Sequence, residues 1–235
     1  MTLDVPAGPW DPDVVEQAQR TPIGALVVDG VVACNRRLGS AEATELVGCG
    51  EAFYPWPRPP ISGVLHATPH WSALTACRLL VIAPATLHAA LTDSDLIGAL
   101  YAACVRRTAS LAVHHAIAQL PRVDLRILVL LWHLATRWGE AEPDGVVLPL
   151  PLSHARLGEL VGAQRSTVTL ALRRLSADGR VQRRTDGSWQ LGRRAPEMLR
   201  PDCTGDVRDE VVRNREQTRR EVERLMQRLS ALDRV

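Results

Sequence analysis

Residues 153–191 constrain the possible fold of this chain most, because they predict two short helices on either side of one glycine, followed by a hairpin. Ser153 is a good N-cap for the first helix, and the second spans Gln164–Ala177. Gly162 stands between them, where a tight turn needs a residue that tolerates positive φ. Each helix has an apolar inner face at helical spacing, formed by Leu157, Leu160 and Val161 and by Val168, Leu172 and Leu175. The segment therefore predicts a helix-turn-helix.

The second helix also has a polar outer face. Arg165, Thr169 and Arg173 are spaced i, i+4 and i+8 and lie along one side, with Ser166 beside them. Arginine can bind guanine O6 and N7 with two hydrogen bonds, and hydroxyls can bond bases or phosphates. An ordinary amphipathic helix with a solvated face would show the same pattern, so this face alone does not decide the function.

A basic hairpin after the second helix favours nucleic acid as the partner. Val181–Thr185 and Ser188–Leu191 are predicted strands around Asp186-Gly187, and the first carries Arg183 and Arg184. Residues 151–200 hold ten arginines against four acidic residues, a net charge of +6. Such a hairpin is typical of a wing whose arginines reach phosphates beside the groove. We expect a winged-helix domain that binds double-stranded DNA.

A long helix is expected over Ser94–Leu120, which contains no proline and no glycine after Gly98. An apolar stripe runs along it, and we expect it to form a homodimer interface as a two-stranded coiled coil, through Ile97, Leu100, Cys104, Leu111 and Ala118. Pro121 ends this helix. A buried helix over Leu125–Trp138 and an edge strand over Val146–Leu152 are expected next.

The first ninety residues predict β-structure. Ile23–Val28 and Val31–Cys34 flank Asp29-Gly30, a strong hairpin signal. Three further short strands are expected at Glu45–Val47, Val64–His66 and Leu79–Ile82. Many short strands with Gly and Pro turns between them indicate a sandwich or barrel.

The stretch LPLSHARLGELVGAQRSTVTLALRRLSADGRVQRR resembles the signature of the Crp/Fnr family of transcription regulators. The resemblance covers about residues 20–200 and implies an α+β chain with an N-terminal β-roll (jelly-roll, cupin-like) sensor over 1–93. A dimerisation helix over 94–120, a winged helix-turn-helix over 121–200 and a C-terminal helical extension over 201–235 would follow. It implies a cytoplasmic homodimer that reads a palindromic operator in the major groove, with RNA polymerase as a further partner.

The resemblance also assigns roles to residues of the recognition helix. The pattern R-x-T-V falls on Arg165-Ser166-Thr167-Val168, so Arg165 matches the guanine-reading arginine. Phosphate contacts fall on Ser153, Gln164 and Thr167. Ser166 replaces an acidic residue common in the family, and Leu170 stands where some members carry a second base-reading arginine. The operator should therefore differ from the best-known site of the family.

The effector is left unknown by the sequence. Members that bind cyclic nucleotides carry Gly-Glu and, some ten residues later, Arg-Ser or Arg-Thr. Here Gly50-Glu51 precedes a proline-rich stretch with only Arg58, so we do not expect control by cyclic AMP. A regulator with a roll that binds no ligand, constitutive or nucleoid-type, is one alternative.

The other alternative is a metal-dependent, cupin-like enzyme, which would need a compact His/Glu ligand set on facing strands. Separately, His66, His70, Cys49 and Cys77 are candidates for a metal or haem site, but we expect them to be separate core or strand residues. The chain has no HxH motif, and its five cysteines form no CxxC pair, so we expect no enzyme and no cofactor. The apolar run Ile127–Trp132 is too short to span a membrane, and no signal peptide is visible. Near the C-terminus an apolar stripe predicts either a short coiled coil or a helix docked on its own chain, through Val222, Leu225, Leu229 and Leu232.

Overall fold

The computed structural model describes residues 2–13, 22–56, 69–84, 88, 90, 91, 93–193, 195, 196 and 206–232. It is a mixed α+β chain, as the sequence predicted, and it divides into two compact units. Met1–Leu111 and Thr218–Val235 form the first unit, and Ala112–Gln217 form the second. Two helices, α3 (Ser94–Ala118) and α7 (Val207–Leu232), contribute to both units.

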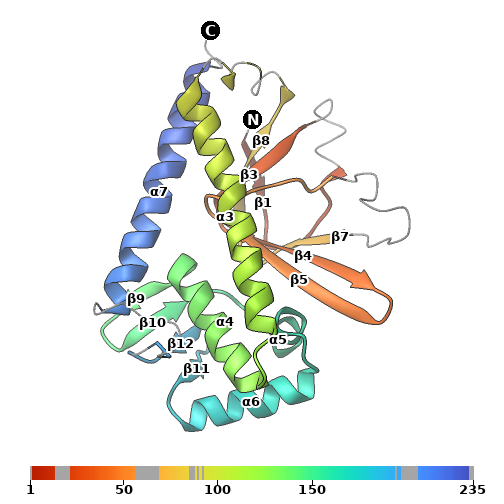
Figure 1. Ribbon diagram of the computed structural model, residues 1–235, viewed down its shortest axis with the longest axis vertical. Coiled ribbons are helices and arrows are strands. Elements are labelled where there is room, and N and C mark those ends of the chain that lie inside the picture. The colour runs from red at the N-terminus through yellow and green to blue at the C-terminus, as the bar shows by residue number, and fades with distance from the viewer. Residues whose placement is uncertain are drawn as a thin grey trace. The chain divides into compact units, whose positions relative to one another are not determined.

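Two four-stranded antiparallel sheets form the β-part of the first unit (Figure 1). One has the order β1-β8-β3-β6, with bounds Thr2–Val5, Cys77–Ile82, Gly24–Asp29 and Ala52–Phe53. The other has the order β2-β7-β4-β5, with bounds Gly8–Trp10, Pro69–Ala73, Val31–Leu38 and Ala41–Gly48. The strands predicted at 45–47 and 79–82 lie within β5 and β8. The one predicted at Val64–His66 falls outside the described residues.

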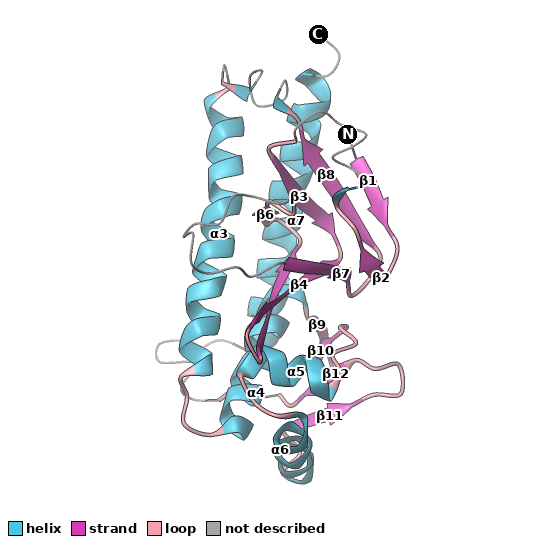
Figure 2. Ribbon diagram, turned by 90° about the vertical axis from the view of Figure 1, so that its right-hand side faces the viewer, coloured by secondary structure: helices cyan, strands magenta, loops and turns pink. Residues whose placement is uncertain are grey.

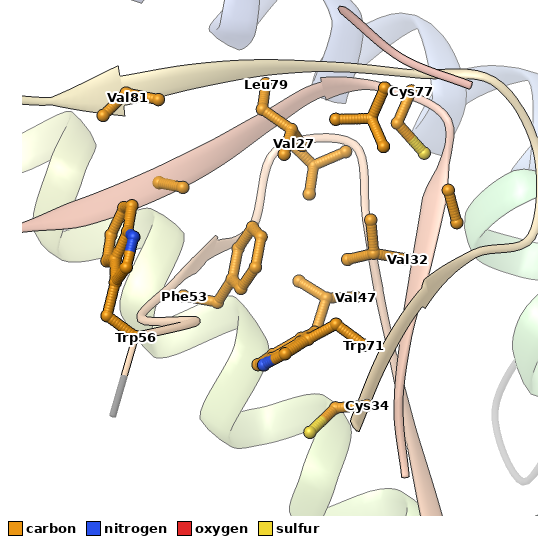
Figure 3. Packing of buried hydrophobic residues seen from close by; sticks show 13 residues of the cluster. Val27, Val32, Cys34, Val47, Phe53, Trp56, Trp71, Cys77, Leu79 and Val81 are labelled. Atoms are coloured by element: carbon orange, nitrogen blue, oxygen red, sulfur yellow. The ribbon is translucent and has the colours of Figure 1, made fainter. Parts of the chain in front are cut away.

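A single apolar core joins the two sheets (Figure 3). Val27 and Leu79 from the first sheet meet Val32 and Val47 from the second, all fully buried. The rings of Phe53 and Trp71 lie 5.1 Å apart, between centroids, in the same core. Alternation along the strands places these residues on the inner faces, as a sandwich requires.

The hairpin predicted at Asp29-Gly30 is wrong. β3 pairs with β8 and β6, whereas β4 pairs with β5 and β7, so the two strands lie in different sheets. The turn carries the chain from one sheet to the other. Gly30 has a φ of 84°, and a Cβ there would lie 2.4 Å from the Ala76 carbonyl oxygen. Glycine is therefore required here because the backbone at residue 30 passes close to that at Ala76, and not because the chain forms a hairpin.

The outer face of the first sheet is covered by two helices. Leu26 and Leu80 alternate with the inward residues and pack against Leu96 and Ala103 of α3. On α7, Val222, Leu225 and Leu229 are buried, and Leu225 and Leu229 belong to this same cluster. Of the two alternatives, the C-terminal helix therefore docks on its own chain. The side chain of Leu232 falls outside the described residues.

The second unit packs helices against a small sheet (Figure 2). Its helices are α4 (Val123–Trp138), α5 (His154–Val161) and α6 (Arg165–Ala177). The sheet has the order β11-β12-β10-β9, with bounds Val181–Arg183, Trp189–Leu191, Gly145–Leu148 and Glu140–Glu142. The predicted edge strand at 146–152 is wrong on two counts. β10 ends at Leu148, before both prolines, and it pairs with strands on both sides.

Candidate nucleic-acid interface

Helices α5 and α6 form the predicted helix-turn-helix, and local signals fix their ends. The Ser153 hydroxyl accepts a hydrogen bond from the Arg156 backbone N–H at 3.1 Å, which caps α5. Gly162 ends α5 in the left-handed region, with φ 64° and ψ 47°. A Cβ at Gly158 would lie 2.5 Å from the Ala163 carbonyl oxygen, so the turn returns close to α5.

Two C-terminal carbonyl groups of α5 form hydrogen bonds with side chains from neighbouring helices. His114 Nε2 lies 2.5 Å from the Leu160 carbonyl oxygen, and Arg126 donates to the Val161 carbonyl at 3.2 Å. These contacts occupy acceptors that a helix end otherwise leaves without partners. The position of α5 is therefore fixed against α3 and α4 within the second unit.

The recognition helix α6 divides cleanly into a buried and an exposed face. Val168, Ala171, Leu172 and Leu175 are buried. Arg165, Ser166, Thr167 and Arg173 are exposed, as is Gln164, which stands at the N-cap without a side-chain capping bond. Leu170 is half exposed on this helix, at 50%. The predicted contact residues therefore lie on the side of α6 that its own domain leaves open.

Thr169 is the exception, because its hydroxyl already has partners inside the protein. The hydroxyl donates to the Arg165 carbonyl at 2.9 Å and lies 2.9 Å from Nδ1 of His154. His154 was not among the residues singled out from the sequence. Its ring centroid lies 6.5 Å from that of Trp189 in β12, so it stands between the recognition helix and the hairpin. Burial, then Arg183 and Arg165, lower the pKa of His154 below its usual 6.5.

The basic hairpin is formed by β11 and β12, shorter than predicted but around the same Asp186-Gly187 turn. Arg183 is exposed, with its guanidinium 5.7 Å from the centre of the Trp189 ring. Arg184 is paired with Glu142 of β9 through two hydrogen bonds, at 2.9 and 3.2 Å. Arg184 must therefore break its ion pair with Glu142 to bind a DNA phosphate, whereas Arg183 has no such ion pair among the described residues.

Comparison with known proteins agrees with this geometry. Residues 125–199 match the family model of the Crp-like helix-turn-helix domain. The second unit therefore carries a Crp-like helix-turn-helix domain, which supports a function as a Crp/Fnr-type DNA-binding transcription regulator. No curated protein sequence matches the chain significantly.

Several solved structures share the fold of this chain. A CRP/FNR-family regulator from Thermus thermophilus is 23% identical, with a TM-score of 0.57 over 81% of this chain and 93% of that one. CLP of Xanthomonas campestris is 19% identical, with a TM-score of 0.57 over 82% and 93%. FixK2 of Bradyrhizobium japonicum is 17% identical, with a TM-score of 0.57 over 87% and 98%.

The predicted dimer stripe lies on a largely exposed side of α3. Ile97 and Leu111 are exposed at 36% and 39%, and Cys104 is exposed, whereas Leu100 and Ala118 are half-buried. Tyr101 and Val105, which the sequence did not single out, add 70% and 45% exposed side chains. Among the described residues, α3 is also the one helix long and apolar enough to cross a membrane; a single such helix is weak evidence of insertion.

A cavity of about 480 Å³ lies in the first unit beside α3. Its wall is mostly apolar and is lined by Ile23, Gly24, Ala52, Phe53, Tyr54, Ile82, Leu100, Cys104, Arg107, Thr108 and Leu111. The one cationic group in the wall, Arg107, is held by the buried Glu45 carboxylate at 2.5 and 2.9 Å. Burial raises the pKa of Glu45, but Arg107 and Arg36 outweigh it and leave the pKa below its usual value. The carboxylate is therefore ionised and neutralises the arginine.

The turn at Gly50-Glu51, where nucleotide-binding members of the family carry their Gly-Glu pair, is hydrogen-bonded within the protein. The Glu51 carboxylate is buried and accepts from the Gly48 N–H at 2.9 Å. The Gly50 carbonyl accepts from Arg106 at 3.1 and 3.2 Å. Arg58 falls outside the described residues, as does His66. Among the residues the structure describes, no group of three His, Cys, Asp or Glu side chains is placed to hold a metal.

Proposed function

We propose that the regulator is a homodimer that reads a palindromic operator by placing α6 in the major groove. The observation that carries the proposal is the exposed polar face of α6, with Arg165 at its N-terminal end. Two such heads related by a twofold axis would contact half-sites one helical turn apart, about 34 Å. Residues at the start of a recognition helix are those that usually meet base edges.

We assign the residues of this face to two kinds of contact. Arg165 reads guanine through its two-pronged guanidinium, with Ser166 and Arg173 beside it. Ser153, Gln164 and Thr167 contact phosphates. The Ser153 hydroxyl accepts the capping bond, which leaves its O–H free to donate to a phosphate oxygen. Arg183 and Arg184 bind phosphate from the hairpin, and Thr169 orients the helix through its bonds to His154 and Arg165.

The dimer is proposed to form through the exposed face of α3. Ile97, Tyr101, Val105 and Leu111 together expose more large apolar side chains than a helix in water favours. A second copy of the same helix would bury them as a two-stranded coiled coil. Dimerisation would also explain the apolar character of α3 without insertion into a membrane. We place the regulator in the cytoplasm, where it meets DNA and RNA polymerase.

Cyclic AMP and cyclic GMP are proposed not to be effectors. A cyclic nucleotide needs backbone N–H groups and an arginine that converge on its phosphate. Here the Glu51 carboxylate accepts a hydrogen bond from the Gly48 N–H of its own turn, and the charge of Arg107 is neutralised by Glu45. A thermal melt of the regulator with each nucleotide tests this, since a ligand that binds the folded state raises the Tm. We expect no rise; a clear rise at micromolar nucleotide would contradict the proposal.

Selection of bound sequences from random duplexes tests the operator proposal itself. We expect an enriched palindrome with half-sites about one helical turn apart. A regulator that recovers no sequence preference, while still binding random DNA, would support the nucleoid-type alternative. Metal analysis of the purified protein addresses the cupin-like enzyme, which predicts a stoichiometric metal; we expect none.

A further inference from the structure

His154 lies beside both the recognition helix and the hairpin, at the start of α5. It is the first residue of α5, and its Nδ1 is 2.9 Å from the Thr169 hydroxyl oxygen. Its ring is tilted by 36° to that of Trp189. The imidazole is partly exposed, so it remains accessible to a ligand on this face. All three residues belong to the second unit.

The hydrogen bonds of Thr169 assign the tautomer of the ring. The Thr169 hydroxyl donates its proton to the Arg165 carbonyl oxygen, so its own oxygen can only accept from His154. Nδ1 must therefore carry a hydrogen, and Nε2 of the neutral ring carries a lone pair. Among the described residues, Nε2 has no hydrogen-bond partner. A proton on Nε2 would thus create a new donor without breaking an existing bond.

The charged groups that face the ring are both cations. They are Arg183 from β11 and Arg165 from α6, and no carboxylate of the described residues acts on the ring beside them. Both repel a positive charge on the imidazole, and burial disfavours it as well. The free protein therefore keeps His154 neutral at pH 7. The larger of the two repulsions, that from Arg183, falls when an anion pairs with its guanidinium.

We propose that His154 is a phosphate contact that acquires its charge when DNA binds. A phosphate that pairs with Arg183 weakens the repulsion, a proton from solvent adds to Nε2, and Nε2–H donates to a phosphate oxygen. No covalent bond forms or breaks other than the N–H bond. The proposal rests on the DNA-binding function above and adds to it a proton taken up with the DNA.

The consequence is a DNA affinity that depends on pH with a defined sign. Binding raises the pKa of His154, so the complex holds more protons than the free species, and acid favours the complex. Affinity should increase as the pH falls through the pKa of the bound state and level off below the pKa of the free state. One proton limits the increase to about tenfold per pH unit.

The experiment measures affinity for a random-sequence duplex at fixed salt, between about pH 5 and 8. Random sequence is sufficient because the proposed partner is phosphate. His154→Gln keeps a donor for Thr169 but cannot be charged, and His154→Arg is charged throughout. His115→Gln is the matched control, because His115 is exposed on α3 and is not among the proposed contacts. Melting temperatures verify that the variants fold.

We expect the wild type and His115→Gln to bind more tightly at low pH. His154→Gln should bind weakly, and its affinity should not change with pH between the pKa values of His154 in the free and bound states. His154→Arg should bind tightly, and its affinity should also be independent of pH in this range. The pKa of His154, followed by NMR, should rise when the duplex is added. A His154→Gln variant that keeps the wild-type pH profile, or an unchanged pKa in the complex, would overturn the proposal. A wild type that binds no duplex at all would instead contradict the function on which it rests.

Discussion

Arg184 of the hairpin and Glu142 of the neighbouring edge strand are joined by two hydrogen bonds, at 2.9 and 3.2 Å. Any phosphate that Arg184 binds must compete with this carboxylate, whereas Arg183 has no such ion pair among the described residues. We therefore predict that Arg183→Ala weakens binding to any duplex more than Arg184→Ala does. Each lost phosphate contact should also flatten the dependence of log affinity on log salt by about one unit of slope.

Glu142→Gln gives the complementary result. Loss of the carboxylate charge should release Arg184 and strengthen binding to operator and random duplex alike. The matched control is Glu140→Gln, because Glu140 lies on the same strand but pairs with Arg215. Anisotropy titrations at several salt concentrations measure both effects. Equal losses for Arg183→Ala and Arg184→Ala, with no gain for Glu142→Gln, would show that the ion pair does not compete with DNA.

The dimer interface can be tested with two exposed valines. Val105→Asp places a charge on the proposed interface of α3, whereas Val212→Asp places one on α7, and the two valines are similarly exposed at 45% and 42%. Because a buried, unpaired charge is costly, we expect Val105→Asp to sediment as a monomer and Val212→Asp as a dimer. A dimer that survives Val105→Asp and a second change, Tyr101→Asp, would locate the interface elsewhere.

The C-terminal helix should contribute to the stability of the first unit. Leu225 is 4% exposed and packs in the cluster with Leu26 and Leu80. Leu225→Ala should lower the free energy of unfolding by about 3 kcal/mol, since it leaves a cavity in that cluster. Val212→Ala, on the exposed side of the same helix, should cost less than about 0.5 kcal/mol. Denaturant titrations compare the two, and similar small losses would mean that α7 is dispensable for this core.

Stability should also fall in mild acid because of His133 in α4. Burial, then Arg137 and His114, lower its pKa from 6.5 to about 4. The folded state therefore favours the neutral ring, so stability is full above about pH 6.5 and is lost as the pH falls toward 4. The loss attributable to this group is about 3 kcal/mol. Unfolding measured at both ends of this range should show a smaller loss for His133→Gln than for the wild type. An unchanged loss would assign the pH dependence to other groups.

Elements with local signals were predictable from the sequence. The cap at Ser153, the glycine at 162 and the periodicity of α6 each depend on a few neighbouring residues, and the structure shows all three. The basic hairpin was predictable for the same reason. Strand pairing depends on residues far apart in the chain, so Asp29-Gly30 indicated a hairpin although its two strands pair in different sheets.

Other features lacked a signal that sequence reasoning could use. The apolar stripe at Val222, Leu225 and Leu229 fits a coiled coil and a docked helix equally well, and only the cluster with Leu26 decides between them. His154 carries no motif, because its role depends on Thr169 and Arg183 from two other elements. Such a role requires the three-dimensional arrangement.

The central claim is that Arg165 reads bases while the hairpin arginines hold phosphates. The most direct measurement is the affinity of Arg165→Ala for the selected operator and for a random duplex, at the same salt. We predict a loss of about 1–3 kcal/mol on the operator and almost none on random DNA. Arg183→Ala, measured in parallel, should weaken both. An Arg165→Ala variant that loses affinity equally for both duplexes would contradict the placement of α6 in the major groove.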